Sequence, residues 1–355
     1  MTLPFNRSRH YAHTGAAGPL VRLAERRGGD QRIVAIGGGT GLPALLRGLV
    51  EIAHPAIDLD ALTAVVTVTD DGGSSGRLRE QFGVLPPGDV RNCLVALAGP
   101  DGALAQFLQH RICDGDSGEA GHPIGNLLLT ALTQVTGDFA KAIAQVGTVV
   151  GARGRVMPTT LENVRLRAEM ETGEVILGET AIVNDPLRIS HLSLSPSPRP
   201  LPDVIRAVIN ADAIVIGPGS LYTSVLPNLL VEGIAATISG SSAVRIYVSN
   251  LMTQPGETDG YSIDDHLRAI REHTGYDLFD YVLVHNGSLN ADAVGRYAQQ
   301  GSTPVARAPK LRFSGSAQVI ECDLAAHDGH GKIRHDPRAL ARAIVTILED
   351  RGARG

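Results

Sequence analysis

The chain has 355 residues, of which 43% are hydrophobic, and a formal net charge of −5. This length allows one large or two ordinary domains with a substantial core, which excludes a chain that is disordered throughout. Charges of both signs are interspersed and no basic stripe with interleaved aromatic residues occurs, so the composition argues against a nucleic-acid partner.

Residues 1–31 mix Arg, His, Gly and Ala without a period, so we expect a flexible N-terminal extension before a single α/β domain over residues 32–355. No apolar run approaches ~18 residues and no secretory signal is present, so we expect no membrane span and a cytoplasmic protein. Cys93, Cys113 and Cys322 show no CxxC spacing and are expected to be reduced thiols.

The most informative segment is a short apolar run, residues 32–36, that breaks into glycines and then into a helical pattern of leucines. The glycines let the backbone approach a ligand closely, and the helix N-terminus favours an anionic oxygen. The predicted phosphate-binding residues here are Gly37, Gly38, Gly39, Thr40 and Gly41. The segment resembles the dinucleotide fingerprint without matching it and lacks the Lys-Ser/Thr pair of a P-loop, so a tight turn without a ligand is the alternative.

A second apolar run, residues 62–68, ends in the adjacent carboxylates Asp70 and Asp71. In dinucleotide-binding folds this position meets a ribose hydroxyl, while a carboxylate pair could instead hold Mg²⁺ beside a diphosphate. Aspartates that bond their own backbone in a solvated turn are the alternative. Arg77, Arg79 and Arg91 are the nearby cations, which could bind phosphate or form surface ion pairs.

The string 72–76 also satisfies Gly-x-Ser-x-Gly, with Ser74 as the serine. Acidic neighbours disfavour a developing oxyanion, so we do not favour an acyl-transfer nucleophile. Asp89 is predicted to cap the helix that follows it. His122 could polarise a substrate oxygen but is more often structural, and His327, His330 and His335 lack ligand spacing and are expected to be solvated.

The helix after Asn126 is nearly all apolar and is predicted to lie deep in the core. Residues 163–183 alternate around a turn and predict an antiparallel hairpin inserted in the α/β body, followed by a helix near 202–210. Strands are expected near 245–249 and 281–285, and Asp336 with Pro337 is expected to begin the last helix.

The pattern of a strand that opens into glycines returns at residues 213–224, which contain the candidate residues Gly217, Gly219, Ser220 and Ser224. Parallel strands end at one edge of a sheet, where open α/β sheets bind ligands. The two glycine loops are therefore predicted to form two walls of one anion site.

Five segments in order, 37–42, 67–79, 88–92, 217–224 and 252–258, together resemble the bacterial gluconeogenesis factor family (YvcK-like). The resemblance implies a Rossmann-like three-layer sandwich with a mostly parallel sheet and a small inserted β-hairpin at about 163–183. It further implies a cytoplasmic protein that binds UDP-sugars such as UDP-N-acetylglucosamine and links growth on gluconeogenic carbon sources to cell shape and peptidoglycan supply.

Within this resemblance, the nucleotide and phosphate side comprises the two glycine loops together with Ser74, Arg77 and Asn92. The sugar or ribose side comprises Asp70, Asp71, Asn126, Asn250, Gln254 and Tyr261. No cofactor is firmly expected, with Mg²⁺ at Asp71 considered. The partners considered are a cell-wall synthesis or regulatory protein and a second copy in a homodimer.

The wider superfamily also resembles the 2-phospho-lactate transferases (CofD-like). That similarity keeps a second reading open, in which the chain transfers a phospho-lactyl-type group from a nucleotide-linked donor. Asp70 and Asp71 would then be the catalytic residues, whereas a regulatory binding protein would need none.

Overall fold

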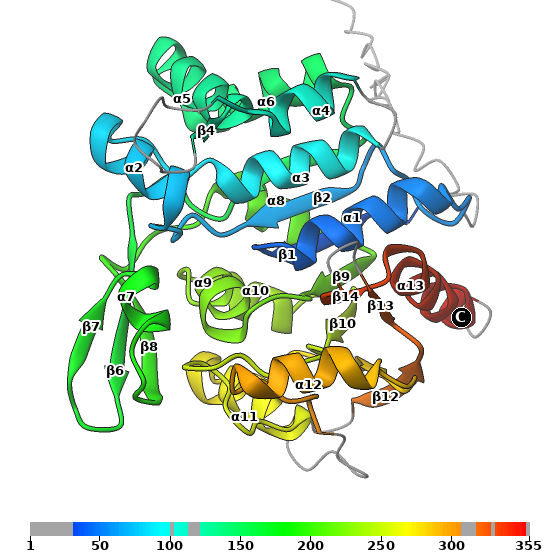
Figure 1. The fold of residues 1–355 in the computed structure, drawn as a ribbon. Helices are drawn as coiled ribbons and strands as arrows, with labels where there is room; N and C mark the ends of the chain where they lie inside the picture. The colour runs from blue at the N-terminus through cyan, green and yellow to red at the C-terminus, as the bar shows by residue number, and fades with distance from the viewer. Residues whose placement is uncertain (1–30, 100–102, 113–120, 307–316, 328–330, 353–355) are drawn as a thin grey trace, which may run out of the picture.

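The computed structural model describes residues 31–99, 103–112, 121–306, 317–327 and 331–352. The expectations for the N-terminal extension, Cys113 and His330 lie outside these residues. The fold is α/β with helices on both faces of a central sheet, so the predicted fold class is confirmed (Figure 1).

The central sheet has seven strands, and every pair of neighbours is parallel. Their order is β12 (Gln318–Cys322), β11 (Tyr281–His285), β10 (Val244–Val248), β9 (Ala213–Ile216), β1 (Ile33–Gly37), β2 (Thr63–Val66) and β5 (Arg155–Pro158). The chain builds the sheet outward from β1 through β2 to β5, then returns to the other side of β1 with β9. The sheet therefore has its topological switch point between β1 and β9, where open α/β sheets bind ligands.

Alternate residues of β1 belong to two separate hydrophobic cores, one on each face of the sheet. Ile33 and Ala35 face the core beneath α1 (Gly41–Ile52), α3 (Gly88–Ala98) and α13 (Pro337–Gly352), whereas Val34 and Ile36 face the opposite core. Because both faces are covered, the strand reads as a continuous apolar run in the sequence.

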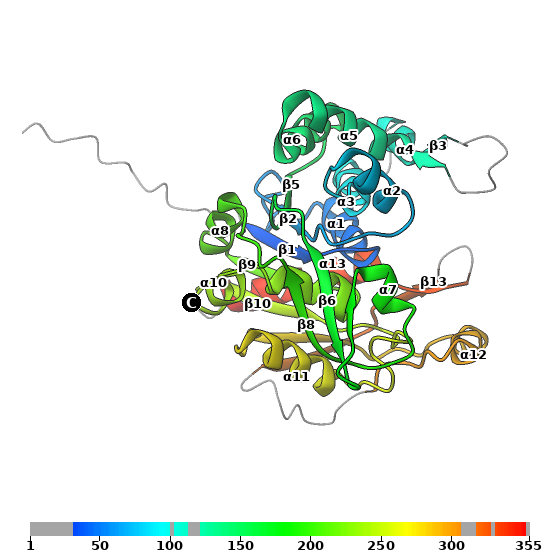
Figure 2. The same ribbon diagram turned by 90° about the vertical axis from the view of Figure 1, so that its left-hand side faces the viewer.

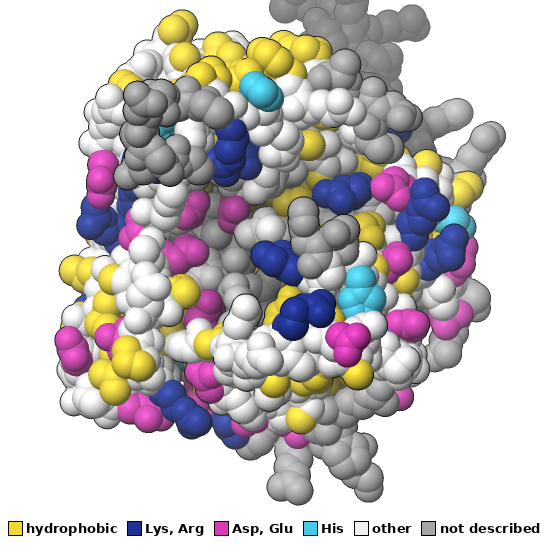
Figure 3. Space-filling view, in the orientation of Figure 1, with side chains coloured by type: hydrophobic (Ala, Val, Ile, Leu, Met, Phe, Trp, Pro, Cys, Tyr) yellow, Lys and Arg dark blue, Asp and Glu magenta, His cyan; other side chains and the backbone are white. Residues whose placement is uncertain are grey.

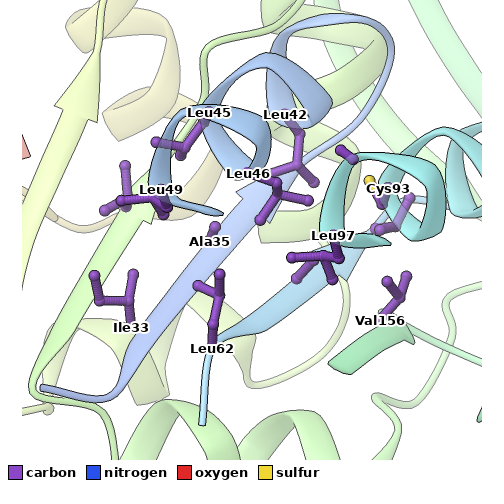
Figure 4. Close-up of a cluster of buried hydrophobic side chains, with 14 of the residues drawn as sticks. Ile33, Ala35, Leu42, Leu45, Leu46, Leu49, Leu62, Cys93, Leu97 and Val156 are labelled. Carbon is purple, nitrogen blue, oxygen red and sulfur yellow. The ribbon is translucent and has the colours of Figure 1, made fainter. Parts of the chain in front are cut away.

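Helix α1 is held to the sheet by leucines at helical spacing, all fully buried: Leu42, Leu45, Leu46 and Leu49. Figure 4 shows them above β1, with Leu97 of α3 packed beside them. Full burial of one such side chain contributes about 1.5–3 kcal/mol, so this stripe fixes the N-terminal end of α1 at the edge of the sheet.

The remaining helices complete the two outer layers. The first face carries α6 (Phe139–Val150) and α12 (Ala291–Gln299), and the second carries α8 (Pro202–Ile209), α9 (Leu226–Leu229), α10 (Ile234–Ser239) and α11 (Ile263–Thr274). The helices α2 (Gly73–Phe82), α4 (Ala103–Gln109) and α5 (Ile124–Thr136) lie along one side of the molecule (Figure 1). In the described part of the chain, no helix is long and apolar enough to cross a membrane.

The prediction that the helix after Asn126 lies deep in the core is wrong. Helix α5 buries Asn126, Leu129 and Thr130, but Val135 is 84% exposed. The leucine cluster was misleading because α5 packs on α6 and α4 at the periphery and buries one face only. The expected start of the last helix is confirmed, since the Asp336 carboxylate accepts a hydrogen bond from the Ala339 N–H at 2.8 Å.

The predicted hairpin is present as β6 (Arg165–Met170) and β7 (Val175–Leu177), which pair antiparallel. The insertion is larger than expected, because β8 (Ile189–Ser195) pairs with the other side of β6, and α7 (Glu179–Val183) lies between β7 and β8 in the chain. Figure 2 shows β6 and β8 side by side with α7 near one end. Buried residues of β6, such as Leu166 and Met170, join the second core, so the insertion is packed on the body.

Candidate ligand-binding site

The two glycine loops lie in contact at the carboxyl ends of β1 and β9. A β-carbon added to Gly41 would stand 2.2 Å from the Pro218 carbonyl oxygen. Gly217 has a φ of 82°, a backbone conformation that favours glycine. The loops therefore form adjoining walls at the switch point, the arrangement that the sequence predicted.

The N-terminus of α1 points into this region without a side-chain cap. Thr40 occupies the N-cap position but makes no capping hydrogen bond, and the first turn contains no acidic residue. The first N–H groups of a helix have no partner within the helix and carry its positive dipole end. This end of α1 is therefore suited to an anion such as a phosphate.

Beside this helix end lies a pocket of about 250 Å³. The predicted site residues that line it are Gly39, Thr40, Gly41, Gly219, Ser220, Ser224, Asn250 and Gln254. The other lining residues were not predicted to belong to the site; they are Ala44, Pro218, Leu251, Met252, Thr253, Tyr297, Ile333, Arg334 and His335. The lining thus combines polar and apolar groups, and it brings together loops that follow β1, β9 and β10.

Hydrogen bonds between side chains connect the second glycine loop to the loop after β10 at the pocket. The Gln254 amide donates to the Ser220 hydroxyl at 2.6 Å, and the Asn250 amide nitrogen lies 3.5 Å from the Gln254 oxygen. The Asn250 side-chain oxygen is buried and has no hydrogen-bond partner among the described residues. Such an acceptor is costly unless a ligand N–H or O–H group satisfies it.

His335 closes another side of the pocket, so the expectation that it is solvated is wrong. It ends β14 (Ile333–His335), and its Nε2 lies 3.1 Å from the Ser249 carbonyl oxygen, which can only accept. Burial, together with the nearby His285, lowers the pKa of His335 to about 4. The ring is therefore neutral at physiological pH, with Nε2 as the donor.

Asp89 does not cap its own helix, contrary to the prediction, because α3 already begins at Gly88. Its carboxylate instead accepts a hydrogen bond from the Gly39 N–H at 2.6 Å. Burial and the neighbouring Asp70 raise the pKa of Asp89 to about 6, against the opposing effects of the Gly39 hydrogen bond and Arg91. A carboxylate thus lies directly behind the first glycine loop.

Ser74 and Asn126 belong to a second polar network, outside the pocket lining. The Ser74 hydroxyl lies 2.8 Å from His122 Nδ1 and accepts from the Asn126 amide at 3.0 Å. The buried Arg91 donates to the Asn126 oxygen at 2.9 Å and to the Asn92 oxygen at 2.7 Å. Burial and Arg111 lower the pKa of Arg91 to about 10, so it remains charged.

This network connects the N-terminal ends of α2, α3 and α5. Ser74 is buried within it, and the pocket described above does not reach its hydroxyl. The serine of the Gly-x-Ser-x-Gly string is therefore buried in a hydrogen-bonded network. This position agrees with the interpretation that Ser74 is not an acyl-transfer nucleophile.

The adjacent carboxylates make local and inter-element contacts away from the pocket. Asp70 accepts from the Gly72 N–H at 2.9 Å, which is the turn geometry named as the alternative. Asp71 accepts from the backbone N–H groups of Glu179 and Thr180, at 3.0 and 2.8 Å, and from the Thr180 hydroxyl at 2.8 Å. Asp71 therefore caps α7 and holds the insertion.

These contacts do not favour a metal ion at Asp71, since both carboxylate oxygens already accept hydrogen bonds. Within the described ranges, no group of three or more His, Cys, Asp or Glu side chains is arranged to hold a metal. The ribose and Mg²⁺ assignments of Asp70 and Asp71 stay predictions.

The other predicted residues do not line the pocket. Gly37 ends β1, and Gly38 follows it against Asp89 and Thr67. Arg77 is half-buried on α2. The Tyr261 hydroxyl lies 2.9 Å from that of the buried Tyr222, whose pKa is raised by burial and by this hydrogen bond. The predicted site residues thus fall into two groups, those that line the pocket and those that lie outside its lining.

An open parallel sheet with a pocket at its switch point defines a class of α/β proteins that bind ligands outside the carboxyl ends of their strands. The model of the family described as 2-phospho-L-lactate transferase CofD matches residues 33–324. The chain therefore belongs to the CofD family.

The relatives place the chain more narrowly, beside proteins named gluconeogenesis factor. It is 44% identical over 317 residues to that of Halalkalibacterium halodurans, covering 89% of this chain and 96% of the relative. It is 40% identical over 324 residues to that of Bacillus subtilis, covering 91% and 100%. A crystal structure of a UPF0052 family member from Bacillus halodurans superposes with a TM-score of 0.83 at 42% identity, covering 89% of this chain and 99% of that one.

Proposed function

We propose that this chain is a cytoplasmic regulatory protein that binds a UDP-sugar, in the manner of a gluconeogenesis factor. The observation that carries the proposal is the pocket between the two glycine loops, next to an uncapped helix N-terminus. Backbone N–H groups at that helix end would bind the diphosphate. The side chains of Asn250, Gln254 and Ser220 would supply hydrogen bonds to hydroxyl and amide groups of the ligand.

Regulation follows if the ligand binds one conformation better than another and a partner protein recognises the result. We propose a protein of cell-wall synthesis or its regulation as that partner, which would connect carbon metabolism to cell shape. The insertion β6–β7–β8 is held to the body through Asp71 and α7. Glu179 of α7 interacts with Asp89, which contacts the first glycine loop, so the insertion is well placed to respond to occupancy.

A transferase is the second candidate, and the match to the CofD family model favours it. In that case the glycine loops would stabilise charge that develops on phosphate. The contacts of Asp71 count against its predicted catalytic role, because both of its oxygens already accept hydrogen bonds from α7.

Calorimetric titration with UDP-N-acetylglucosamine, UDP and GDP, with and without Mg²⁺, followed by mass spectrometry of the recovered ligand, separates the candidates. Tight binding of intact UDP-N-acetylglucosamine without turnover supports the regulatory protein. Preference for GDP or chemical consumption of the ligand supports the transferase. Absence of binding to all three would contradict the proposed pocket.

A further inference from the structure

Among the described residues, Asp89 is the acidic side chain that forms a hydrogen bond with the first glycine loop. Its Oδ2 accepts from the Gly39 N–H at 2.6 Å, and a β-carbon on Gly38 would stand 2.8 Å from the same oxygen. Gly39 also lines the pocket. A phosphate bound at the N-terminus of α1 would therefore lie close to the Asp89 carboxylate, which the Gly39 N–H holds in place.

Several groups influence the charge of Asp89. Arg91 on α3 favours its ionised form, and Asp70 after β2 disfavours it. Glu179 on α7 also interacts with Asp89, but burial and the surrounding carboxylates raise the pKa of Glu179 well above its usual value. The Cys93 thiol has its pKa raised in the same way. Near pH 7.5, Asp89 is therefore ionised, whereas burial favours the neutral forms of Glu179 and Cys93.

The pocket offers few cations to offset a second negative charge. Among the described residues that line it, Arg334 is the one cationic side chain and there is no lysine. Figure 3 shows acidic side chains gathered on the α7 side of the central hollow of this face. Each additional charge on a bound ligand therefore adds an unfavourable interaction with the acidic side.

We infer that Asp89 makes the site select the esterified diphosphate of a nucleotide sugar over the terminal phosphate of a free nucleoside diphosphate. Each phosphate of a nucleotide sugar carries one negative charge. The terminal phosphate of a nucleoside diphosphate loses a second proton near pH 6 or somewhat above, as other phosphate monoesters do. At pH 7.5 the free diphosphate therefore carries about one more negative charge close to Asp89.

This selection deepens the proposed function and rests on it. It would let the protein respond to the nucleotide sugar while ignoring the free diphosphate that sugar-transfer reactions release. Discrimination then comes from a repulsive group behind the loop and does not need a further contact to the sugar.

The experiment is calorimetric titration at pH 7.5 of the wild type and Asp89→Asn with UDP-N-acetylglucosamine, UDP and uridine. Asparagine keeps an oxygen that can accept from the Gly39 N–H, so only the charge is removed. We expect the wild type to prefer UDP-N-acetylglucosamine over UDP by roughly tenfold, about 1.4 kcal/mol. In Asp89→Asn the affinity for both phosphorylated ligands should rise, and the rise for UDP should be about tenfold larger, so that the preference largely disappears.

Uridine, which carries no phosphate, should bind both proteins equally. Glu179→Gln is the matched control, because burial disfavours the charged form of the carboxyl group that it replaces, and its preference should equal that of the wild type. An unchanged preference in Asp89→Asn, or weaker binding of both phosphorylated ligands, would overturn the inference and leave the proposed function standing. Absence of binding by the wild type would overturn both.

A pH series on the wild type keeps the inference testable if Asp89→Asn does not fold. Between pH 7.5 and 5.5 the diphosphate diester does not titrate, whereas Asp89 gains a proton with a pKa of about 6. Affinity for UDP-N-acetylglucosamine, relative to uridine, should therefore rise several-fold as the pH falls. The same rise is expected in Glu257→Gln, which removes another buried carboxyl group, with a pKa of about 7. A flat series overturns the inference.

Discussion

The backbone of Gly41 lies directly against the carbonyl group of Pro218, so that a β-carbon at residue 41 would stand 2.2 Å from the Pro218 oxygen. This contact joins the helix that follows β1 to the loop that follows β9. No ordinary rotamer change can relieve an overlap with a backbone carbonyl. The spacing of the two pocket walls therefore depends on the absence of a side chain at residue 41.

We expect Gly41→Ala to lower the free energy of unfolding by about 1–3 kcal/mol, since overpacking forces the backbone to shift. Urea unfolding measures this change. Gly295→Ala is the matched control, because Gly295 is a helical glycine with no atom near its virtual β-carbon. That control should stabilise the protein by up to about 1 kcal/mol. Equal stability of Gly41→Ala and the wild type would show that the loops can separate freely.

Asn250→Ala should weaken the binding of UDP-N-acetylglucosamine by about tenfold and leave the unfolding midpoint nearly unchanged. The buried Asn250 oxygen has no hydrogen-bond partner in the part of the chain that the structure describes, so its removal should cost a contact to the ligand more than an internal contact. Calorimetric titration and thermal unfolding measure the two effects. A large loss of stability with normal binding would assign Asn250 to the fold alone.

Asp71→Asn should loosen the attachment of α7 and the insertion. Three hydrogen bonds converge on the Asp71 carboxylate, and bonds to a charged acceptor contribute more than neutral ones. We expect faster proteolysis at the turn between β6 and β7 and a loss of about 1–2 kcal/mol in stability. The loss should be the same with Mg²⁺ and with a chelator. A loss confined to the Mg²⁺ buffer would instead support the predicted metal site.

Between pH 6.5 and 4, His335 should make the folded protein less stable as the pH falls. Its pKa is about 4 in the folded state against an ordinary 6.5, so the unfolded chain binds more protons in this window and stability rises with pH. The shift corresponds to roughly 3 kcal/mol across the window. Asp89 acts in the opposite direction, because its pKa is raised, so the test is the difference between wild type and His335→Gln in chemical unfolding at several pH values. Parallel curves for the two proteins would contradict the assignment.

Much of the fold could be predicted because its signals are local. Strands buried on both faces appear as short apolar runs, and the expected strand at residues 281–285 coincides with β11. The leucine spacing of α1 and the two glycine loops could be read in the same way. The strand β8 was missed because its exposed serines and histidine interrupt the apolar pattern, and its pairing with β6 depends on the tertiary arrangement.

The candidate site was only partly predictable, for a physical reason that its contacts make clear. Glycine loops can be recognised from the local sequence. By contrast, the contact of Asp89 with Gly39 joins residues 50 positions apart, and the contact of His335 with Ser249 joins residues 86 positions apart. The local sequence alone predicted that Asp89 caps a helix and that His335 is exposed to solvent. Burial and the groups brought near by the fold decide both roles instead.

The central place of β1 in the sheet sets the order in which the molecule can be assembled during synthesis. β2 follows soon after β1, but β9, its other neighbour, begins 180 residues after Ile33. At about 5–20 residues per second, β1 therefore waits on the order of ten seconds or longer with one edge unpaired. The wall that carries His335 emerges later still. Any ligand of the pocket can consequently stabilise only the finished chain, which gives completed molecules an advantage over truncated ones.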